Sequence, residues 1–302
     1  MNEWISFAQH QSAGCRLGHN SFILSSSDAR RWCNSMFSNN IRALQPSEGN
    51  RSAICDDRGR VQGLLDVYCL DPEHFLCVLD GVDQEWFLNR FKMYLILDDI
   101  ELDDVQPELF HLCGPNTEFV LQSTGLPTPP QDQSVAQDDV HTVLRKNRFG
   151  PNGVDIITSD VNVLQERLQQ AGAHLVPEQA FDALRILHGR ARWPNDGSDK
   201  SMIHELQLNE ECCAFDKGCY IGQEIINRID VKGLINKKIQ RLQITGEATL
   251  QDSLMLDGKI VGTLSSIAQL DDRTVGLSVL RKKAWTPGTR LSLASGGQAT
   301  VE

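Results

Sequence analysis

Between residues 51 and 127 the hydrophobic pattern changes period several times, and this alternation restricts the possible folds more than any other feature of the chain. Three runs rich in β-branched and other apolar residues predict strands, and a turn at residues 57–59 joins the first two. Residues 81–96 then show the 3.6-residue period of an amphipathic helix. Its inward-facing side chains are expected to be Trp86, Phe87, Phe91 and Tyr94. Two further strands and a short helix complete the order βββαββα, which is typical of one α+β subdomain.

The regions on either side of this segment predict more helices. Ser and Asp residues just before position 29 are candidate N-caps. A strand is predicted to end at residues 158–160, followed by a helix over about 161–172 with Leu164 and Leu168 facing inward, and by another helix over 178–187. Residues 125–139 are rich in Pro, Gln and Asp and predict a loop.

The C-terminal residues 232–302 carry short strands divided by Gly, Asp and Pro. This pattern predicts a small all-β domain, either a barrel or a sandwich. The chain as a whole is therefore expected to have an α+β fold.

Length and charge narrow the possible classes of protein. The chain has 302 residues, which leaves room for two or three domains. Its net charge of −11 argues against general nucleic-acid binding, which requires a basic surface. No apolar run reaches the roughly 18 residues that a membrane span needs, and the first residues lack the features of a signal or transit peptide. We therefore expect a cytoplasmic protein without a membrane span.

Nine cysteines are spread irregularly along the chain, and no C-x2-C pair indicates a zinc ribbon or a redox dithiol. In a reducing cytoplasm most of them should be buried as small hydrophobic side chains. The neighbouring Cys212 and Cys213 match no common zinc pattern, so no metal site is predicted. Cys219 differs from the others, because it lies in the stretch KGCYIGQE with glycines and charged residues on both sides.

The residues after Cys219 predict a short helix over about 222–229, because three isoleucines there have helical spacing. Cys219 would then lie just before a helix N-terminus, where free N–H groups and the helix dipole favour an anion. Lys217 is two residues away, and both influences would lower the pKa of the Cys219 thiol.

The same stretch offers groups that suit a ligand. Gly218 and Gly222 leave room for close approach of a ligand to the backbone. Gln223 and Glu224 provide an amide and a carboxylate for hydrogen bonds to a heterocycle. The alternative, from the pattern alone, is a glycine-rich turn that happens to contain a cysteine.

Residues 217–241 form a basic segment within an acidic chain. Six basic residues against two acidic ones give this segment a local charge of +4. It is either a docking patch for an anion or a solvated basic face.

The stretch KGCYIGQE, followed by Arg228, resembles the signature of the YgfZ-type folate-binding proteins. These proteins are relatives of the glycine-cleavage T-protein, an aminomethyltransferase, and include mitochondrial iron–sulfur assembly factors. Residues 25–41, 56–68, 153–176 and 183–189 are similar to further segments of the family.

The resemblance implies a T-protein-like ring of three domains around a central folate site. The first domain would be discontinuous, over residues 1–50 and 128–231. Residues 51–127 would form an inserted, ferredoxin-like subdomain, and residues 232–302 a small C-terminal β-barrel.

The resemblance also implies a function. The chain would be a tetrahydrofolate-binding accessory protein that supports assembly or repair of iron–sulfur enzymes, and its partners would be iron–sulfur client or assembly proteins. Cys219 would be the reactive thiol, and Lys217 would tune it. The other residues of the implied ligand site are Gly218, Tyr220, Gly222, Gln223, Glu224, Arg228 and Glu205.

Two departures from the T-protein pattern argue against aminomethyl transfer, which is the main alternative function. The T-proteins carry a pterin-binding glutamate where this chain has Leu187, and an aspartate where it has Asn40. Leucine cannot pair with pterin donors, and an amide cannot act as a carboxylate. Glu205 is a candidate to replace the missing glutamate. A scaffold that keeps the fold without the ligand is the third possibility.

Overall fold

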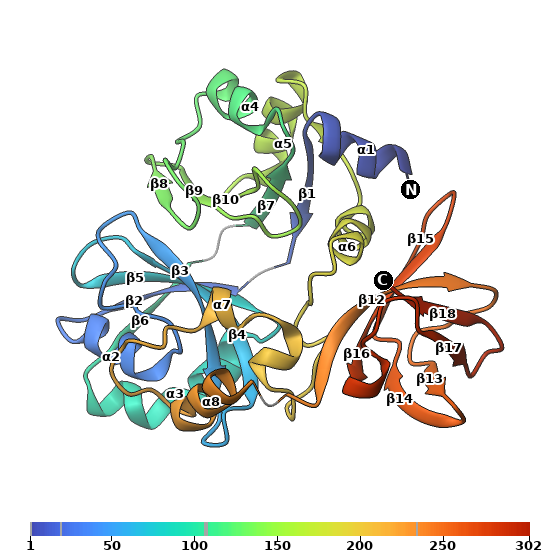
Figure 1. Ribbon diagram of the computed structural model, residues 1–302. Coiled ribbons are helices and arrows are strands. Elements are labelled where there is room, and N and C mark those ends of the chain that lie inside the picture. Colours follow the sequence, from blue (N-terminus) through green and yellow to red (C-terminus); the bar gives the residue numbers. More distant parts are fainter. Residues whose placement is uncertain (1, 19, 106–107, 234) are drawn as a thin grey trace.

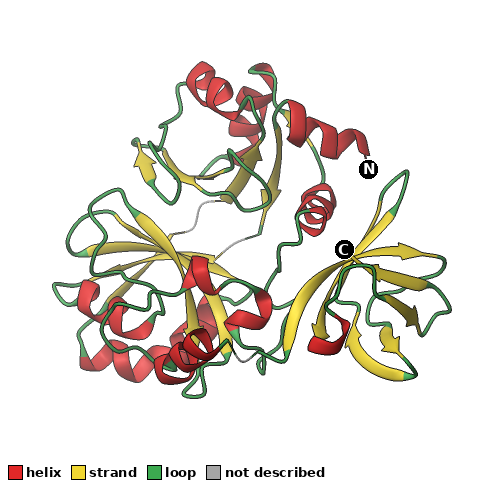
Figure 2. Cartoon of the chain, in the orientation of Figure 1, coloured by secondary structure: helices red, strands yellow, loops and turns green. Residues whose placement is uncertain are grey.

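Three lobes, each built on one β-sheet, surround the middle of the molecule in the computed structural model (Figure 1). The structure describes residues 2–18, 20–105, 108–233 and 235–302. Helices cover the sheets of two lobes, whereas the C-terminal lobe is almost entirely strand and loop (Figure 2).

The first lobe contains a six-stranded mixed sheet in the order β11-β1-β7-β10-β9-β8. Its strands are β1 (Ala13–Leu17), β7 (Glu108–Cys113), β8 (Val135–Gln137), β9 (His141–Arg145), β10 (Val154–Thr158) and β11 (His174–Leu175). Its helices are α1 (Asn2–His10), α4 (Thr117–Thr124), α5 (Val161–Gln170) and α6 (Glu178–Leu187). Leu164 and Leu168 of α5 are buried against the sheet, as their helical spacing predicted. Asp160 caps α5 by accepting a hydrogen bond from the Val163 N–H at 3.1 Å.

The second lobe contains a five-stranded antiparallel sheet in the order β3-β4-β5-β2-β6. Its strands are β2 (Asn20–Ser25), β3 (Gly49–Cys55), β4 (Val61–Cys69), β5 (His74–Asp80) and β6 (Glu101–Val105). Two helices, α2 (Ala29–Met36) and α3 (Gln84–Leu97), pack on it. Trp32 and Phe37 meet Phe87 and Phe91 of α3 in edge-on or tilted ring contacts. Phe87 also contacts the ring of Phe22 on β2, which ties α3 to the sheet.

The C-terminal lobe is a seven-stranded half-barrel in the order β14-β13-β17-β18-β12-β16-β15. Its strands are β12 (Lys237–Thr245), β13 (Ser253–Leu256), β14 (Lys259–Thr263), β15 (Ser266–Gln269), β16 (Thr274–Arg281), β17 (Arg290–Leu293) and β18 (Gln298–Val301), with a short 3-10 helix η2 (Lys282–Ala284). The sheet curves so that β14 reaches β16, where the Ser278 hydroxyl donates to the Thr263 carbonyl at 2.7 Å. A Cβ on Gly262 would lie 2.6 Å from Leu280, so only glycine permits this approach.

The segment between α6 and β12 links the lobes and carries the cysteine stretch. It contains η1 (Ile203–Leu206), α7 (Asn209–Cys212) and α8 (Gln223–Lys232). Helix α8 begins close to its predicted start, and Ile226 is its fully buried residue.

The order βββαββα predicted for residues 51–127 is confirmed by β3, β4, β5, α3, β6, β7 and α4. The sheet pairing, however, divides this segment. β7 and α4 belong with β1 in the first lobe, whereas β3, β4, β5 and β6 share the sheet of the second lobe with β2. The chain thus changes sheet between β1 and β2 and again between β6 and β7, not at the predicted boundaries. The prediction that Tyr94 faces inward is wrong, since its side chain is 44% exposed.

Candidate functional site

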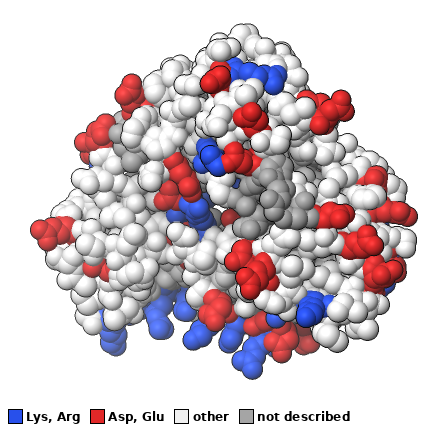
Figure 3. Space-filling view, turned by 180° about the vertical axis from the view of Figure 1, so that it is seen from behind, with Lys and Arg blue, Asp and Glu red and all other residues white. Residues whose placement is uncertain are grey.

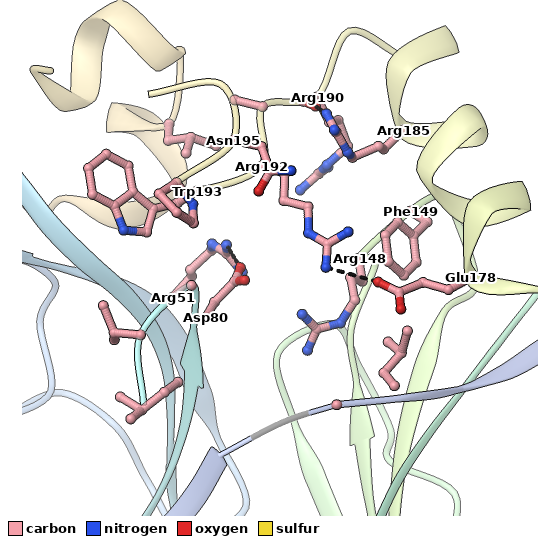
Figure 4. Close-up of a pocket in the computed structure, with 18 of the residues that line it drawn as sticks. Arg51, Asp80, Arg148, Phe149, Glu178, Arg185, Arg190, Arg192, Trp193 and Asn195 are labelled. Atoms are coloured by element: carbon pink, nitrogen blue, oxygen red, sulfur yellow. Dashed lines mark hydrogen bonds and ion pairs between the residues drawn. The ribbon is translucent and has the colours of Figure 1, made fainter. Parts of the chain in front are cut away.

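A cavity of about 390 Å³ lies where the lobes meet (Figure 4). Its walls come from the chain after β1, the end of β5, the loop after β9, and α6 with the segment that follows it. Five arginines line it: Arg51, Arg148, Arg185, Arg190 and Arg192. Three carboxylates also line it: Asp80, Asp83 and Glu178. In the space-filling view from behind, charged side chains gather around a hollow near the middle of the molecule (Figure 3).

Acidic partners fix the directions of these arginines before any ligand arrives. Arg148 pairs with Asp155 at 2.6 Å, and Arg192 pairs with Glu178 at 2.9 Å. Arg51 forms an ion pair with Asp80. The guanidinium groups of Arg51, Arg148 and Arg192 point into the same space from different elements (Figure 4). Rigid guanidinium groups of this kind suit bidentate recognition of carboxylate or phosphate.

Buried charged side chains lie next to the arginines of the cavity. His111 and Arg148 both contact Asp155, and His111 lies 2.7 Å from it. Burial alone would raise the pKa of Asp155, but Arg148 and His111 hold it well below its ordinary range. Lys146 forms an ion pair with Asp66, and both side chains are almost fully buried. Burial and the nearby Arg51 lower the pKa of Lys146.

Arg185 joins the cavity wall to the C-terminal lobe. Its guanidinium donates to Asp182 at 2.6 Å, to Asp196 at 2.8 Å and to the hydroxyl of Ser266 on β15 at 2.8 Å. Since all of these partners are protein groups, Arg185 acts as a structural connection between lobes.

The predicted reactive thiol lies outside this cavity. Cys219 is exposed, in the loop before α8, whereas the other eight cysteines are buried free thiols. The prediction that most cysteines are buried is therefore confirmed.

Lys217 is tied to the second lobe. Its ammonium donates to the carbonyls of Asn34, Phe37 and Asn39 at 2.6, 2.7 and 2.6 Å, and lies 5.0 Å from the centre of the Tyr220 ring. These carbonyls belong to the C-terminal end of α2 and the turn after it, where carbonyls lack helical partners. Burial lowers the pKa of Lys217 to about 8. The ammonium is thus committed to the backbone, and its tuning of Cys219 stays a prediction.

The two glycines of the stretch have different surroundings. Gly222 has a φ of 85°, and a Cβ there would lie 2.5 Å from the Asp56 carbonyl and 2.8 Å from the Gly59 Cα. Close packing on the β3–β4 turn therefore explains Gly222 without a ligand. Gly218 has no atom within 4 Å of a Cβ position. Tyr220 is 7% exposed and packs in the core beneath α8.

Gly222→Ala is expected to lower the free energy of unfolding by about 1–3 kcal/mol, because the left-handed backbone and the contact with the turn are both strained by a methyl group. Gly218→Ala is the matched control and should change it by less than about 0.5 kcal/mol. Urea denaturation of both variants measures the difference. Equal destabilisation by the two substitutions would contradict this account.

The remaining predicted residues are scattered. The Gln223 amide donates to the Lys217 carbonyl at 3.3 Å. Glu224 and Arg228 are exposed on α8. Glu205 caps η1, where it accepts the Met202 N–H at 3.2 Å, and it lines a separate groove beside the C-terminal sheet. Burial raises its pKa.

None of the nine predicted site residues is among the described residues that line the central cavity. Sequence reasoning missed the cavity arginines as a group, because they come from distant positions and share no local motif. Among the described residues, no group of three or more His, Cys, Asp or Glu side chains is arranged to hold a metal ion. No helix in the described ranges has the length and apolar character needed to cross a membrane.

The fold is that of aminomethyltransferase T. The crystal structure of the glycine cleavage system aminomethyltransferase T from Bartonella henselae matches 99% of this chain and 87% of that protein with a TM-score of 0.88, at 15% sequence identity. No family model matches the chain.

Curated relatives define the type of protein more closely. The tRNA-modifying protein YgfZ of Buchnera aphidicola is 23% identical over 266 residues, which cover 84% of this chain and 82% of that protein. A mitochondrial iron–sulfur cluster assembly factor, an IBA57 homolog of Dictyostelium discoideum, is 22% identical and covers 76% of this chain and 63% of its own length. The predicted resemblance is confirmed: sequence and fold fit a YgfZ-type protein.

Proposed function

We propose that this chain is a tetrahydrofolate-binding accessory protein for assembly or repair of iron–sulfur enzymes. The central cavity with its five arginines is the observation that carries the proposal. The names of the relatives support it, since they describe an iron–sulfur cluster assembly factor and tRNA-modifying proteins.

The residues of the cavity fit a folate. Its volume of about 390 Å³ lies in the range of cavities that enclose small organic ligands. The guanidinium groups of Arg190 and Arg192 are partly exposed and suit the carboxylates of a glutamate tail. The carboxylate of Asp80 offers an acceptor to pterin N–H groups, and Phe149 offers a ring face.

Cys219 is the reactive thiol in this proposal. It is exposed and lies before the N-terminus of α8, so an incoming partner protein can reach it. Iron–sulfur client or assembly proteins are the partners we propose. The eight buried free thiols fit a reducing compartment, and the cytoplasm is the location we propose.

Aminomethyl transfer is the second candidate, and two positions disfavour it. The Asn40 side-chain oxygen accepts the Ala43 N–H at 3.2 Å and caps a turn. Leu187 packs against an apolar cluster to which all three lobes contribute. Neither position supplies a carboxylate to a folate.

Arg192→Ala is expected to weaken tetrahydrofolate binding about tenfold or more, because a partly buried charge-assisted hydrogen bond contributes about 1.5–3 kcal/mol. Arg228→Ala is the control, since Arg228 is exposed on α8 and does not line the cavity. It should change the affinity less than about twofold. Isothermal titration calorimetry with tetrahydrofolate measures both.

The reverse order of effects would move the folate site to the cysteine stretch, where the sequence alone had predicted it. Absence of binding by the parent protein would overturn the folate proposal and favour the scaffold function.

A further inference from the structure

Two cations lie opposite each other on the outer face of the C-terminal half-barrel. The register of β12 and β16 pairs Lys237 with Arg281. Two residues away on the same face of the sheet, Ile239 and Val279 form the next pair and pack in the apolar core. Like charges directly opposite each other destabilise a sheet. Neither cation has an ion pair or hydrogen bond through its side chain within the described ranges, so an anion between them would relieve their repulsion.

Both cations line a groove of about 380 Å³ between this face and the segment that follows α6. Ile260, Val261 and Val279 add apolar surface to the groove, and serine side chains add hydroxyls. The volume lies in the range of sites that enclose a small organic ligand. The groove thus suits a molecule with an anionic group and an apolar body.

Two carboxylates in the groove differ in what they already bind. Asp196 is satisfied, because it accepts hydrogen bonds from the Arg185 guanidinium at 2.8 Å and from two serine hydroxyls. One oxygen of Glu205 accepts the Met202 N–H at 3.2 Å, and among the described residues no donor reaches its other oxygen. Burial raises the pKa of Glu205, although Lys237 opposes the shift, so this carboxylate readily accepts a proton.

The two cations and the free carboxylate oxygen together select among anions. A carboxylate or a sulfate ester carries no proton near neutral pH, so an ionised Glu205 repels it. A phosphomonoester has a second pKa of about 6 and can keep one proton. We propose that the groove binds such a phosphate as its monoanion: Lys237 and Arg281 face its charged oxygens, and Glu205 accepts the hydrogen of its P–OH group.

Isothermal titration calorimetry of the full chain at about pH 6 tests the proposal with two probes of similar shape, phenyl phosphate and phenyl sulfate. The phenyl phosphate monoanion and phenyl sulfate have the same charge, but only the phosphate has a proton to donate. We expect a dissociation constant of about 0.1–1 mM for phenyl phosphate and at least about tenfold weaker binding of phenyl sulfate. The titrations contain no folate, so their outcome is independent of the proposed function.

Three variants separate the roles of the charged groups. Glu205→Gln should reduce the preference for phosphate to within about twofold, because an amide can donate to either probe and still accept the Met202 N–H. Arg281→Gln should weaken phenyl phosphate binding at least about fivefold. Lys259→Gln is the matched control, since Lys259 is exposed on β14 in the same lobe and does not line the groove. It should change the affinity less than about twofold. Circular dichroism verifies that each variant is folded.

Inorganic phosphate distinguishes two sources of the ligand. Tighter binding of phenyl phosphate would identify a phosphomonoester whose body lies on the apolar wall, and equal or tighter binding of inorganic phosphate would identify free phosphate. Four results would each overturn the proposal: no binding of either phosphate, equal affinity for phenyl phosphate and phenyl sulfate, a preference that survives Glu205→Gln, or equal losses in Lys259→Gln and Arg281→Gln.

Discussion

Asp66→Ala is expected to lower the free energy of unfolding by about 3–5 kcal/mol, the largest effect among the substitutions considered. Asp66 on β4 is 1% exposed and holds Lys146, which follows β9 in the other lobe. It also lies 3.5 Å from Arg51. Removing this carboxylate leaves a buried ammonium without its partner, and burial already lowers the pKa of Lys146. Urea denaturation measures the loss.

The double variant Asp66→Leu with Lys146→Met separates the ion pair from simple packing. Replacing both charges by apolar groups of similar size is often close to neutral, because neither charge is left unpaired. Arg51 keeps Asp80 as a partner in this variant. We expect the double variant to be more stable than either single charge removal. A double variant as unstable as the sum of its parts would show that the pair contributes through shape and not through charge.

Lys217→Ala is expected to lower the free energy of unfolding by about 2–4 kcal/mol. The substitution removes three charge-assisted hydrogen bonds and leaves the carbonyls of Asn34, Phe37 and Asn39 without this partner. It should also release the loop that carries Cys219. The rate of alkylation of Cys219, followed by mass spectrometry, reports that release.

Lys232→Ala is the control for this substitution. Lys232 is exposed on α8, so its loss should change stability by less than about 0.5 kcal/mol. If Lys217→Ala leaves stability unchanged while altering only the reactivity of Cys219, Lys217 acts on the thiol and not as a structural tie.

The sequence predicts the structure correctly where residues close together in the chain determine it. The spacing of Leu164 and Leu168 predicted helix α5, and both side chains are buried. The exposed position of Cys219 follows in the same way from its polar neighbours.

Features that depend on distant partners were not predictable. β1 and β2 are short, and their partners lie far away in sequence: β1 pairs with β7 and β11, and β2 with β5 and β6. A hydrophobic pattern identifies a strand but not the sheet that it joins. For the same reason the cavity was missed, since Arg51 and Arg192 become neighbours only after the lobes assemble.

Because the walls of the cavity come from different lobes, binding of a ligand there would depend on assembly of the lobes. Arg51 comes from the second lobe, Arg148 from the first, and Arg192 from the segment that leads to the C-terminal half-barrel. A molecule that contacts all three binds only the assembled arrangement, so its binding free energy adds to the free energy that holds the lobes together. Such a ligand would therefore stabilise the assembled lobes against opening, and an opening between the lobes would release it.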